Sequence, residues 1–150
     1  MEGSYTIEDS FRTQEQILKQ VYQSLDENKV LLAGTLLKPS MTIEGAQCKD
    51  RNFPHKIAEM TLQNLESHVP CNVPGIMFLS GGLSEEQAQL NLHAINRKKH
   101  EKKHPWTLSF CYGRALQDSC LKTWKGKEEN RNEAYQVLLM NLKKNFDIVK

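Results

Sequence analysis

Long apolar runs are missing from the sequence, and so is a strong charge of either sign. No stretch approaches the roughly 20 consecutive apolar residues that a membrane-spanning helix needs, so we expect no membrane partner. The formal net charge of +2 is too small to indicate binding to nucleic acid or to a membrane surface. These two absences favour a water-soluble globular protein whose partners are of another kind.

Cysteine pairs at zinc-binding spacing are missing from the sequence, which excludes a zinc site of the common type. The four cysteines stand at positions 48, 71, 111 and 120, with no CxxC pair and no matching histidine spacing. Cys71 and Cys111 lie in or beside apolar stretches, where a free thiol behaves as a small hydrophobe. We expect reduced structural thiols and no metal site, as is usual in the cytoplasm. The acidic, polar start "MEGSYTIEDS" predicts neither a signal peptide nor a transit peptide.

The residues that are present suit a single domain. A chain of 150 residues with 39% apolar and 25% charged residues can bury an ordinary core. Apolar residues recur at helical spacing in residues 10–27, in the segment that starts at Asn52 and Pro54, from Ser84 onward, and in residues 114–124 and about 128–146. Asn52 is a possible cap for the second of these helices, and Ser84 with Gln87 forms a capping box for the third.

Three apolar segments between these helices predict strands. They span Val30–Leu37, residues 73–82 and residues 106–113, and the first is continuous enough to suit a strand buried on both faces. Strands that alternate with helices imply an α/β fold with a parallel sheet. A doubly wound sheet and a (β/α)8 barrel both have this rhythm, and both place their chemistry at the carboxyl ends of the strands.

A basic segment, "RKKHEKKH" at residues 97–104, lies before the third strand. It is open to two interpretations, a nuclear-import or nucleic-acid patch and a solvated surface loop. The loop is the better interpretation, because no aromatic residues are interleaved with the basic ones.

Lys38 ends the first predicted strand, in the stretch "KVLLAGTLLKPSM". At the mouth of a barrel, desolvation would lower the pKa of its amine toward neutrality, and a neutral amine can form a Schiff base with a carbonyl. The alternative is a lysine whose stem packs on the protein while its amine reaches water. Taken alone, the position of Lys38 does not separate these two interpretations.

The other two strand ends point to an anion. "LSGG" supplies Ser80, Gly81 and Gly82, whose backbone N–H groups can approach a phosphate closely. "YGRA" supplies Gly113 and then Arg114 at the start of a helix, which adds a fork of donors to the positive helix end. Together with a strand-end lysine, these turns predict a phosphate ester that carries a carbonyl group.

Three long motifs resemble class I fructose-bisphosphate aldolase: "GTLLKPSM", "VPGIMFLSGGLSEEQAQLNLHAIN" and "LSFCYGRALQDSCLKTWKGK". The resemblance runs from about residue 2 to residue 145. It implies that residues 1–150 are the C-terminal portion of a (β/α)8 TIM barrel, a partial barrel with its last three parallel strands and flanking helices. It further implies that Lys38 is the Schiff-base lysine and that Ser80, Gly81, Gly82, Gly113 and Arg114 hold a substrate phosphate.

The implied activity is the glycolytic cleavage of fructose 1,6-bisphosphate to dihydroxyacetone phosphate and glyceraldehyde 3-phosphate, with no metal and no other cofactor. The family's acid and base residues come from earlier strands and have no counterpart here, so we expect the chain alone to be inactive. Cys111 stands where the family commonly has a serine, and the end "NFDIVK" lacks the family's terminal tyrosine.

Three situations remain open: a fragment of a longer product, a truncated paralogue that pairs with another chain or forms a homo-oligomer, and a decayed copy. Three strands cannot close a barrel, and the first would leave an apolar edge in water. The alternative function is a non-catalytic chain that binds a sugar phosphate or a protein partner.

Overall fold

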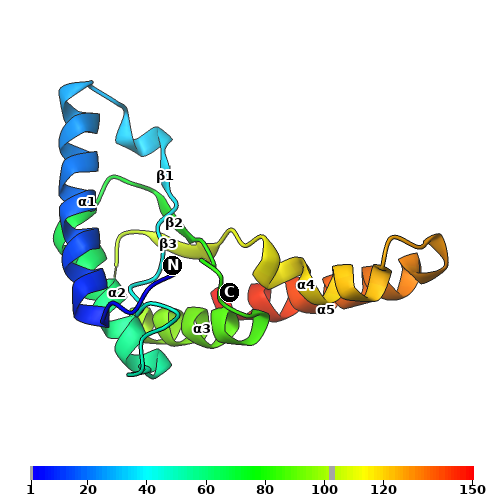
Figure 1. Ribbon diagram of the computed structural model, residues 1–150. Helices are drawn as coiled ribbons and strands as arrows, with labels where there is room; N and C mark the ends of the chain where they lie inside the picture. The colour runs from blue at the N-terminus through cyan, green and yellow to red at the C-terminus, as the bar shows by residue number, and fades with distance from the viewer. Residues whose placement is uncertain (1, 102–103) are drawn as a thin grey trace.

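The computed structural model describes residues 2–101 and 104–150, and it has the predicted alternation of strands and helices. Figure 1 shows the chain with its elements labelled. The main elements are α1 (Ile7–Glu27), β1 (Leu36–Leu37), α2 (Pro54–His68), β2 (Gly75–Phe78), α3 (Glu85–Glu101), β3 (Thr107–Phe110), α4 (Arg114–Trp124) and α5 (Arg131–Val149). Two short 3₁₀ helices, η1 (Leu32–Gly34) and η2 (Glu128–Asn130), precede β1 and α5.

The three strands form one parallel sheet in the order β1-β2-β3. Leu36 lies opposite Gly75, and Gly75 in turn lies opposite Thr107, so the strands start at the same level. An α/β fold with three parallel strands and flanking helices is therefore confirmed.

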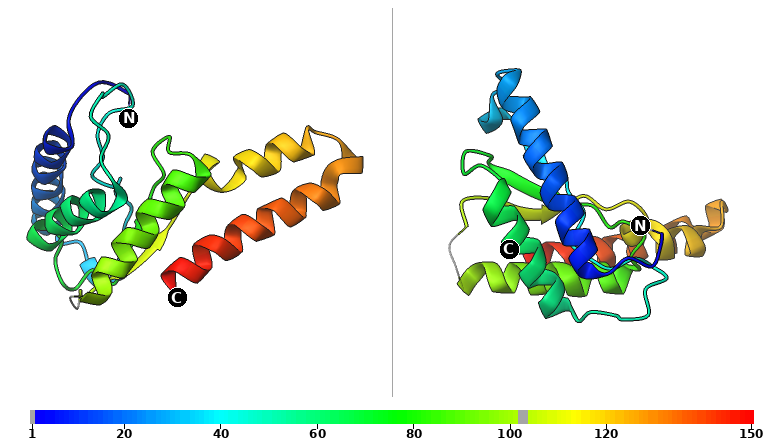
Figure 2. Two further views of the ribbon diagram at one scale, coloured as in Figure 1. Left: turned by 90° about the horizontal axis from the view of Figure 1, so that it is seen from below. Right: turned by 60° about the vertical axis from the view of Figure 1, so that its left-hand side comes forward.

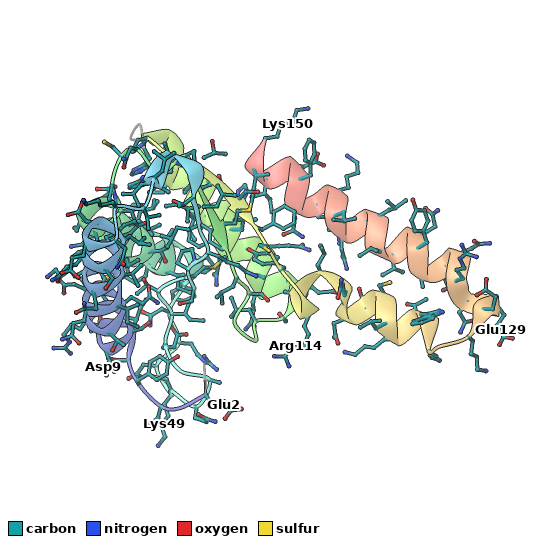
Figure 3. All side chains as sticks on the ribbon, turned by 90° about the horizontal axis from the view of Figure 1, so that it is seen from above. Glu2, Asp9, Lys49, Arg114, Glu129 and Lys150 are labelled. Carbon is teal, nitrogen blue, oxygen red and sulfur yellow. The ribbon has the colours of Figure 1, made fainter. Side chains whose placement is uncertain are left out.

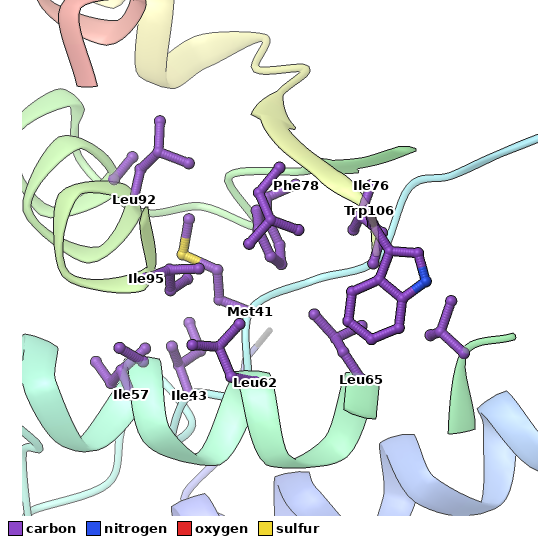
Figure 4. Close-up of a cluster of buried hydrophobic side chains, with 14 of the residues drawn as sticks. Met41, Ile43, Ile57, Leu62, Leu65, Ile76, Phe78, Leu92, Ile95 and Trp106 are labelled. Atoms are coloured by element: carbon purple, nitrogen blue, oxygen red, sulfur yellow. The ribbon is translucent and has the colours of Figure 1, made fainter. Parts of the chain in front are cut away.

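The core lies between one face of the sheet and helices α2 and α3 (Figure 4). Ile76 and Phe78 of β2 and Leu108 of β3 point to this side and are fully buried. Because side chains alternate along a strand, Met77 and Ser109 lie on the opposite face, where they are only half-buried. The helical spacing predicted for α2 and α3 gives each helix one inner face, and the residues of that face are buried: Ile57, Ala58, Thr61, Leu65, Ala88, Leu92 and Ile95.

Local capping sets where the helices begin. α1 begins three residues before its predicted start, because Thr6 and Asp9 form a capping box there. The predicted capping box of Ser84 and Gln87 is confirmed at α3. Asn52 does not cap α2, so that prediction is wrong. Its backbone and side-chain N–H groups donate to Glu44, and Phe53 holds the cap position.

The first strand is much shorter and more exposed than predicted. It covers Leu36–Leu37 only, η1 occupies part of the predicted segment, and Leu31 and Leu36 are 76% and 56% exposed. The prediction of a strand over Val30–Leu37 buried on both faces is therefore wrong. The physical reason is that β1 is an edge strand of this sheet, so one side has no neighbour to bury it.

The basic segment 97–104 is not simply a surface loop. α3 continues to Glu101, and residues 102–103 lie outside the described part of the chain. The His104 side chain is buried, stacks on Trp106, and has Nδ1 3.5 Å from Glu66 Oε1. The loop prediction is wrong for residues 97–101, because α3 continues through them.

α4 and α5 form a helical hairpin that projects away from the sheet (Figures 1 and 2). The predicted final helix is confirmed, but several of its apolar side chains face outward, with Tyr135 and Phe146 more than half exposed. In residues 2–101 and 104–150, no helix is both long and apolar enough to cross a membrane.

Candidate functional site

The carboxyl ends of the three strands meet at one edge of the sheet. After β1, Ser40 forms a parallel bridge with Leu79, and Leu79 N donates to Pro39 O at 3.0 Å. After β2, Phe78 O accepts from Cys111 N at 2.9 Å. The segments that carry Lys38, Ser80 and Gly113 therefore leave the sheet side by side, as parallel strands require.

The turn after β2 uses glycine where the backbone requires it. Gly81 and Gly82 have φ angles of 55° and 86°, a region that residues with a side chain seldom adopt. Leu83 N donates to Ser80 O at 3.0 Å and closes the turn, and the capping box of α3 follows at once. The turn thus presents its backbone next to the N-terminus of a long helix.

The turn after β3 delivers Arg114 as the first residue of α4. Gly113 holds the cap position and has no side chain to satisfy the first N–H groups of the helix. The Arg114 side chain is exposed (Figure 3), and it makes no hydrogen bond or ion pair with any described residue. A cation and open helix N–H groups at one point favour an anionic ligand.

Gly82 and Arg114 line one open groove of about 940 Å³ between α3, α4 and α5. The groove also holds two more cations, Lys122 and Lys144, and three carboxylates, Glu85, Glu86 and Asp118. Lys122 donates to Asp118 at 2.6 Å, and this hydrogen bond raises the pKa of the lysine. Lys144, in contrast, has no such partner among residues 2–101 and 104–150.

Glu85 joins the walls of this groove. Its Oε1 accepts from both the backbone N and the Oγ of Ser119, each at 2.9 Å, and Ser119 Oγ accepts from Asn141 Nδ2 at 2.9 Å. Sequence reasoning missed these three residues. They are far apart in the chain, and no local spacing could have indicated that they meet.

Tyr112 fixes the start of the Gly113–Arg114 turn against α3. Its hydroxyl donates to Ala88 O at 3.3 Å, and its ring lies beside Phe110. Burial raises the pKa of this hydroxyl, so Tyr112 stays neutral and keeps its role as a donor.

The Lys38 side chain is exposed to water. The sequence left two interpretations open, an amine desolvated at the mouth of a barrel and a lysine whose amine reaches water, and the exposure seen here is that of the second. In the described part of the chain, Lys38 lines neither the groove of Gly82 and Arg114 nor either of two smaller cavities, one beside α1 and one between α2 and α3. The reason is the exposed edge at β1, which leaves nothing on one side of Lys38 to exclude water.

The cysteines differ from the expectation of small buried hydrophobes. All four are free thiols, but Cys71 and Cys111 are exposed, and Cys111 lies on the segment that leads to Arg114. Within the described ranges, no three His, Cys, Asp or Glu side chains gather as they would around a metal ion.

Comparison with known proteins accounts for this arrangement. The family model "Fructose-bisphosphate aldolase class-I" matches residues 1–149. A cytoplasmic isozyme from Spinacia oleracea is 49% identical over 98% of this chain, and a chloroplastic enzyme from Chlamydomonas reinhardtii is 46% identical over 98%. The parallel α/β fold and this family match show that the chain belongs to the class I fructose-bisphosphate aldolase family.

The structure agrees with this assignment. An aldolase from Plasmodium falciparum, solved in complex with TRAP and a small-molecule inhibitor, superposes with a TM-score of 0.93 at 42% identity. That match covers 99% of this chain and 42% of the solved chain. The chain likewise spans 40% and 38% of the lengths of the Spinacia and Chlamydomonas relatives. Its three strands therefore match part of the aldolase TIM barrel.

Proposed function

We propose that this chain carries the carbonyl-binding and phosphate-binding part of a class I fructose-bisphosphate aldolase site. Lys38 is the amine that forms the Schiff base, and Ser80, Gly81, Gly82, Gly113 and Arg114 hold a substrate phosphate. The observation that supports this most is the meeting of the three strand ends at one sheet edge. There the two turns offer backbone N–H groups and a free arginine fork.

The chemistry starts at the amine of Lys38. Its Nζ adds to the C2 carbonyl of fructose 1,6-bisphosphate, and loss of water from the carbinolamine leaves an iminium ion. The iminium takes up the electron pair of the C3–C4 bond as glyceraldehyde 3-phosphate leaves, which gives the enamine of dihydroxyacetone phosphate. Protonation and hydrolysis then release the second product, so the cycle needs no metal or other cofactor.

Cleavage also needs a general acid and a general base, and their loss typically lowers a rate about 10²- to 10⁴-fold each. We propose that residues 1–150 are the C-terminal portion of the barrel, with its last three strands, and that the remaining strands supply these groups. The partner that supplies these groups is then a chain that carries the rest of the barrel. A homo-oligomer of this chain is the alternative partner, and it would bind a sugar phosphate without the acid and base. We propose the cytoplasm as the location of either assembly.

One observation favours a second candidate function. Gly82 and Arg114 share a groove, whereas Lys38 is exposed and lies outside it. A chain in this state can hold an anion without forming a Schiff base. The second candidate is therefore a non-catalytic chain that binds a sugar phosphate or a protein partner.

Borohydride trapping separates the two. The chain is incubated with dihydroxyacetone phosphate, reduced, digested and analysed by peptide mass spectrometry. The aldolase proposal expects a reduced adduct on Lys38 that is lost in Lys38→Met and weakened in Arg114→Ala. Lys49→Met, which removes another exposed lysine, is the matched control and keeps the adduct. Phosphate binding without any adduct on Lys38 would favour the non-catalytic function.

A further inference from the structure

Glu85 brings a negative charge into the groove that we propose for a phosphate, which electrostatics alone would disfavour. If the groove of Gly82 and Arg114 takes a phosphate, a carboxylate in its wall should repel that ligand. Glu86 follows on the same helix turn and lines the same groove, so its charge should act in the same way. The two carboxylates differ in their contacts, and that difference indicates a specific role for Glu85.

The Glu85 carboxylate is hydrogen-bonded to a residue of a second helix, α4. One carboxylate oxygen accepts two hydrogen bonds from Ser119, from the backbone N and from Oγ, both at 2.9 Å. Ser119 Oγ in turn accepts from Asn141 on α5, which is buried and also donates to Leu116 O at 3.3 Å. Glu86 is exposed and makes no hydrogen bond or ion pair within the described chain.

The contacts of Glu85 connect the two turns that would hold the phosphate. Glu85 is the first residue of α3, three residues after Gly82, and it lies within the capping box that Ser84 and Gln87 form. Ser119 lies in α4, little more than one helical turn after Arg114. The Tyr112 hydroxyl already joins the residue before the Gly113–Arg114 turn to Ala88 of α3. The bonds of Glu85 add a second connection to α4 beyond Arg114, where α4 and α5 project away from the sheet (Figure 2).

We propose that Glu85 is a positioning residue that holds Arg114 and the Ser80–Gly82 turn at the separation a phosphate needs, through its paired hydrogen bonds to Ser119. This inference rests on the proposed phosphate site. Asn141 completes the unit, because it fixes the Ser119 hydroxyl from the side of α5. The cost of a like charge near the ligand is offset by the fixed geometry of the site.

A purely electrostatic effect of Glu85 and a positioning role predict opposite changes in phosphate affinity, so the inference can be tested. If only charge matters, Glu85→Ala and Glu86→Ala both strengthen phosphate binding. If Glu85 positions the site, Glu85→Ala weakens binding by about three- to tenfold, the effect of losing one or two hydrogen bonds. Glu85→Gln keeps an oxygen that can accept both bonds and loses the charge, so it binds at least as tightly as the parent.

The experiment titrates the full 150-residue chain and its variants with inorganic phosphate, followed by two-dimensional amide NMR. The spectra also report amide exchange at Ser119, which is expected to rise in Glu85→Ala and to stay at the parent value in Glu86→Ala. A thermal unfolding scan of each variant checks that all of them are folded. Ser119→Ala, which removes the hydroxyl and leaves the backbone bond, is expected to weaken binding less than Glu85→Ala.

The outcomes separate the two proposals. No phosphate binding by the parent chain would overturn the proposed phosphate site itself. Phosphate binding by the parent that is unchanged or tighter in Glu85→Ala would leave that site standing and overturn the positioning role of Glu85. Weaker binding in Glu85→Ala that Glu85→Gln restores supports it.

Discussion

Single polar residues hold the loop that follows Lys38. Thr42 and Thr61 are both buried, and Thr61 Oγ1 accepts from Thr42 N at 2.9 Å. Gln14 on α1 adds to this by donating to Ser40 Oγ and Met41 O and by accepting from Thr42 Oγ1. The strand end that carries Lys38 is thus attached to both α1 and α2.

Thr61→Val tests that attachment. The change keeps the shape of the side chain but leaves the buried Thr42 N–H without an acceptor, so we expect the free energy of unfolding to fall by about 1–3 kcal/mol. Thr61→Ser keeps the acceptor and loses a methyl group, with a cost of about 0.8 kcal/mol. Urea denaturation measures both. Equal stability of Thr61→Val and the parent would contradict the importance of this bond.

The start of α1 depends on a capping box with a charged member. Hydrogen bonds from Thr6, and more weakly the contact with Arg12, hold the pKa of Asp9 below its ordinary value of 3.8. Because this folded-state pKa is lowered, the stabilisation is present above the ordinary pKa. It is lost as the pH falls through the lower, folded-state value.

We therefore expect Asp9→Asn to be less stable than the parent at neutral pH and to approach it as the pH falls below 3.8. Helical circular dichroism on thermal unfolding, recorded from pH 6 to pH 2, gives the difference directly. Asp26→Asn, whose side chain makes no hydrogen bond or ion pair in the described ranges, is the control and stays close to the parent. A difference that does not change with pH would contradict the assignment to Asp9.

The edge strand β1 is the shortest strand of the sheet. Leu36 is more than half exposed there, and an apolar parallel edge in water promotes association. Leu36→Lys is expected to lower aggregation, measured by light scattering, with less than about 1 kcal/mol change in stability. Leu90→Lys, at a residue of α3 with similar exposure, is the control. If only the control lowers aggregation, the edge is not its cause.

Local patterns predicted the helices better than the first strand. The buried face of α2 and the Ser84 capping box of α3 depend on residues close together in the chain, so sequence spacing was enough to find them. The extent of β1 depends on whether a neighbouring strand covers it, which no local pattern contains. The bonds of Glu85 to Ser119 join residues 34 positions apart and were missed for the same reason.

At the scale of the whole molecule, the chain resembles a segment cut from a larger barrel. The match to the Plasmodium falciparum structure covers nearly all of this chain and 42% of that one. The opposite face of the sheet is only partly covered, and the α4–α5 hairpin exposes Tyr135 and Phe146. Lys38 is exposed for a similar reason, because β1 is an edge strand of the described sheet and has a neighbour on one side only. We therefore expect its environment to change most when the rest of a barrel is added.

Complementation with the missing strands is the direct test of the role of Lys38. A polypeptide with the earlier strands of the Spinacia oleracea relative is mixed with this chain, and cleavage of fructose 1,6-bisphosphate is followed with a coupled assay. We expect turnover that needs both chains and is lost with Lys38→Met but not with Lys49→Met. A folded complex without turnover, or with equal turnover in Lys38→Met, would contradict the assignment of Lys38.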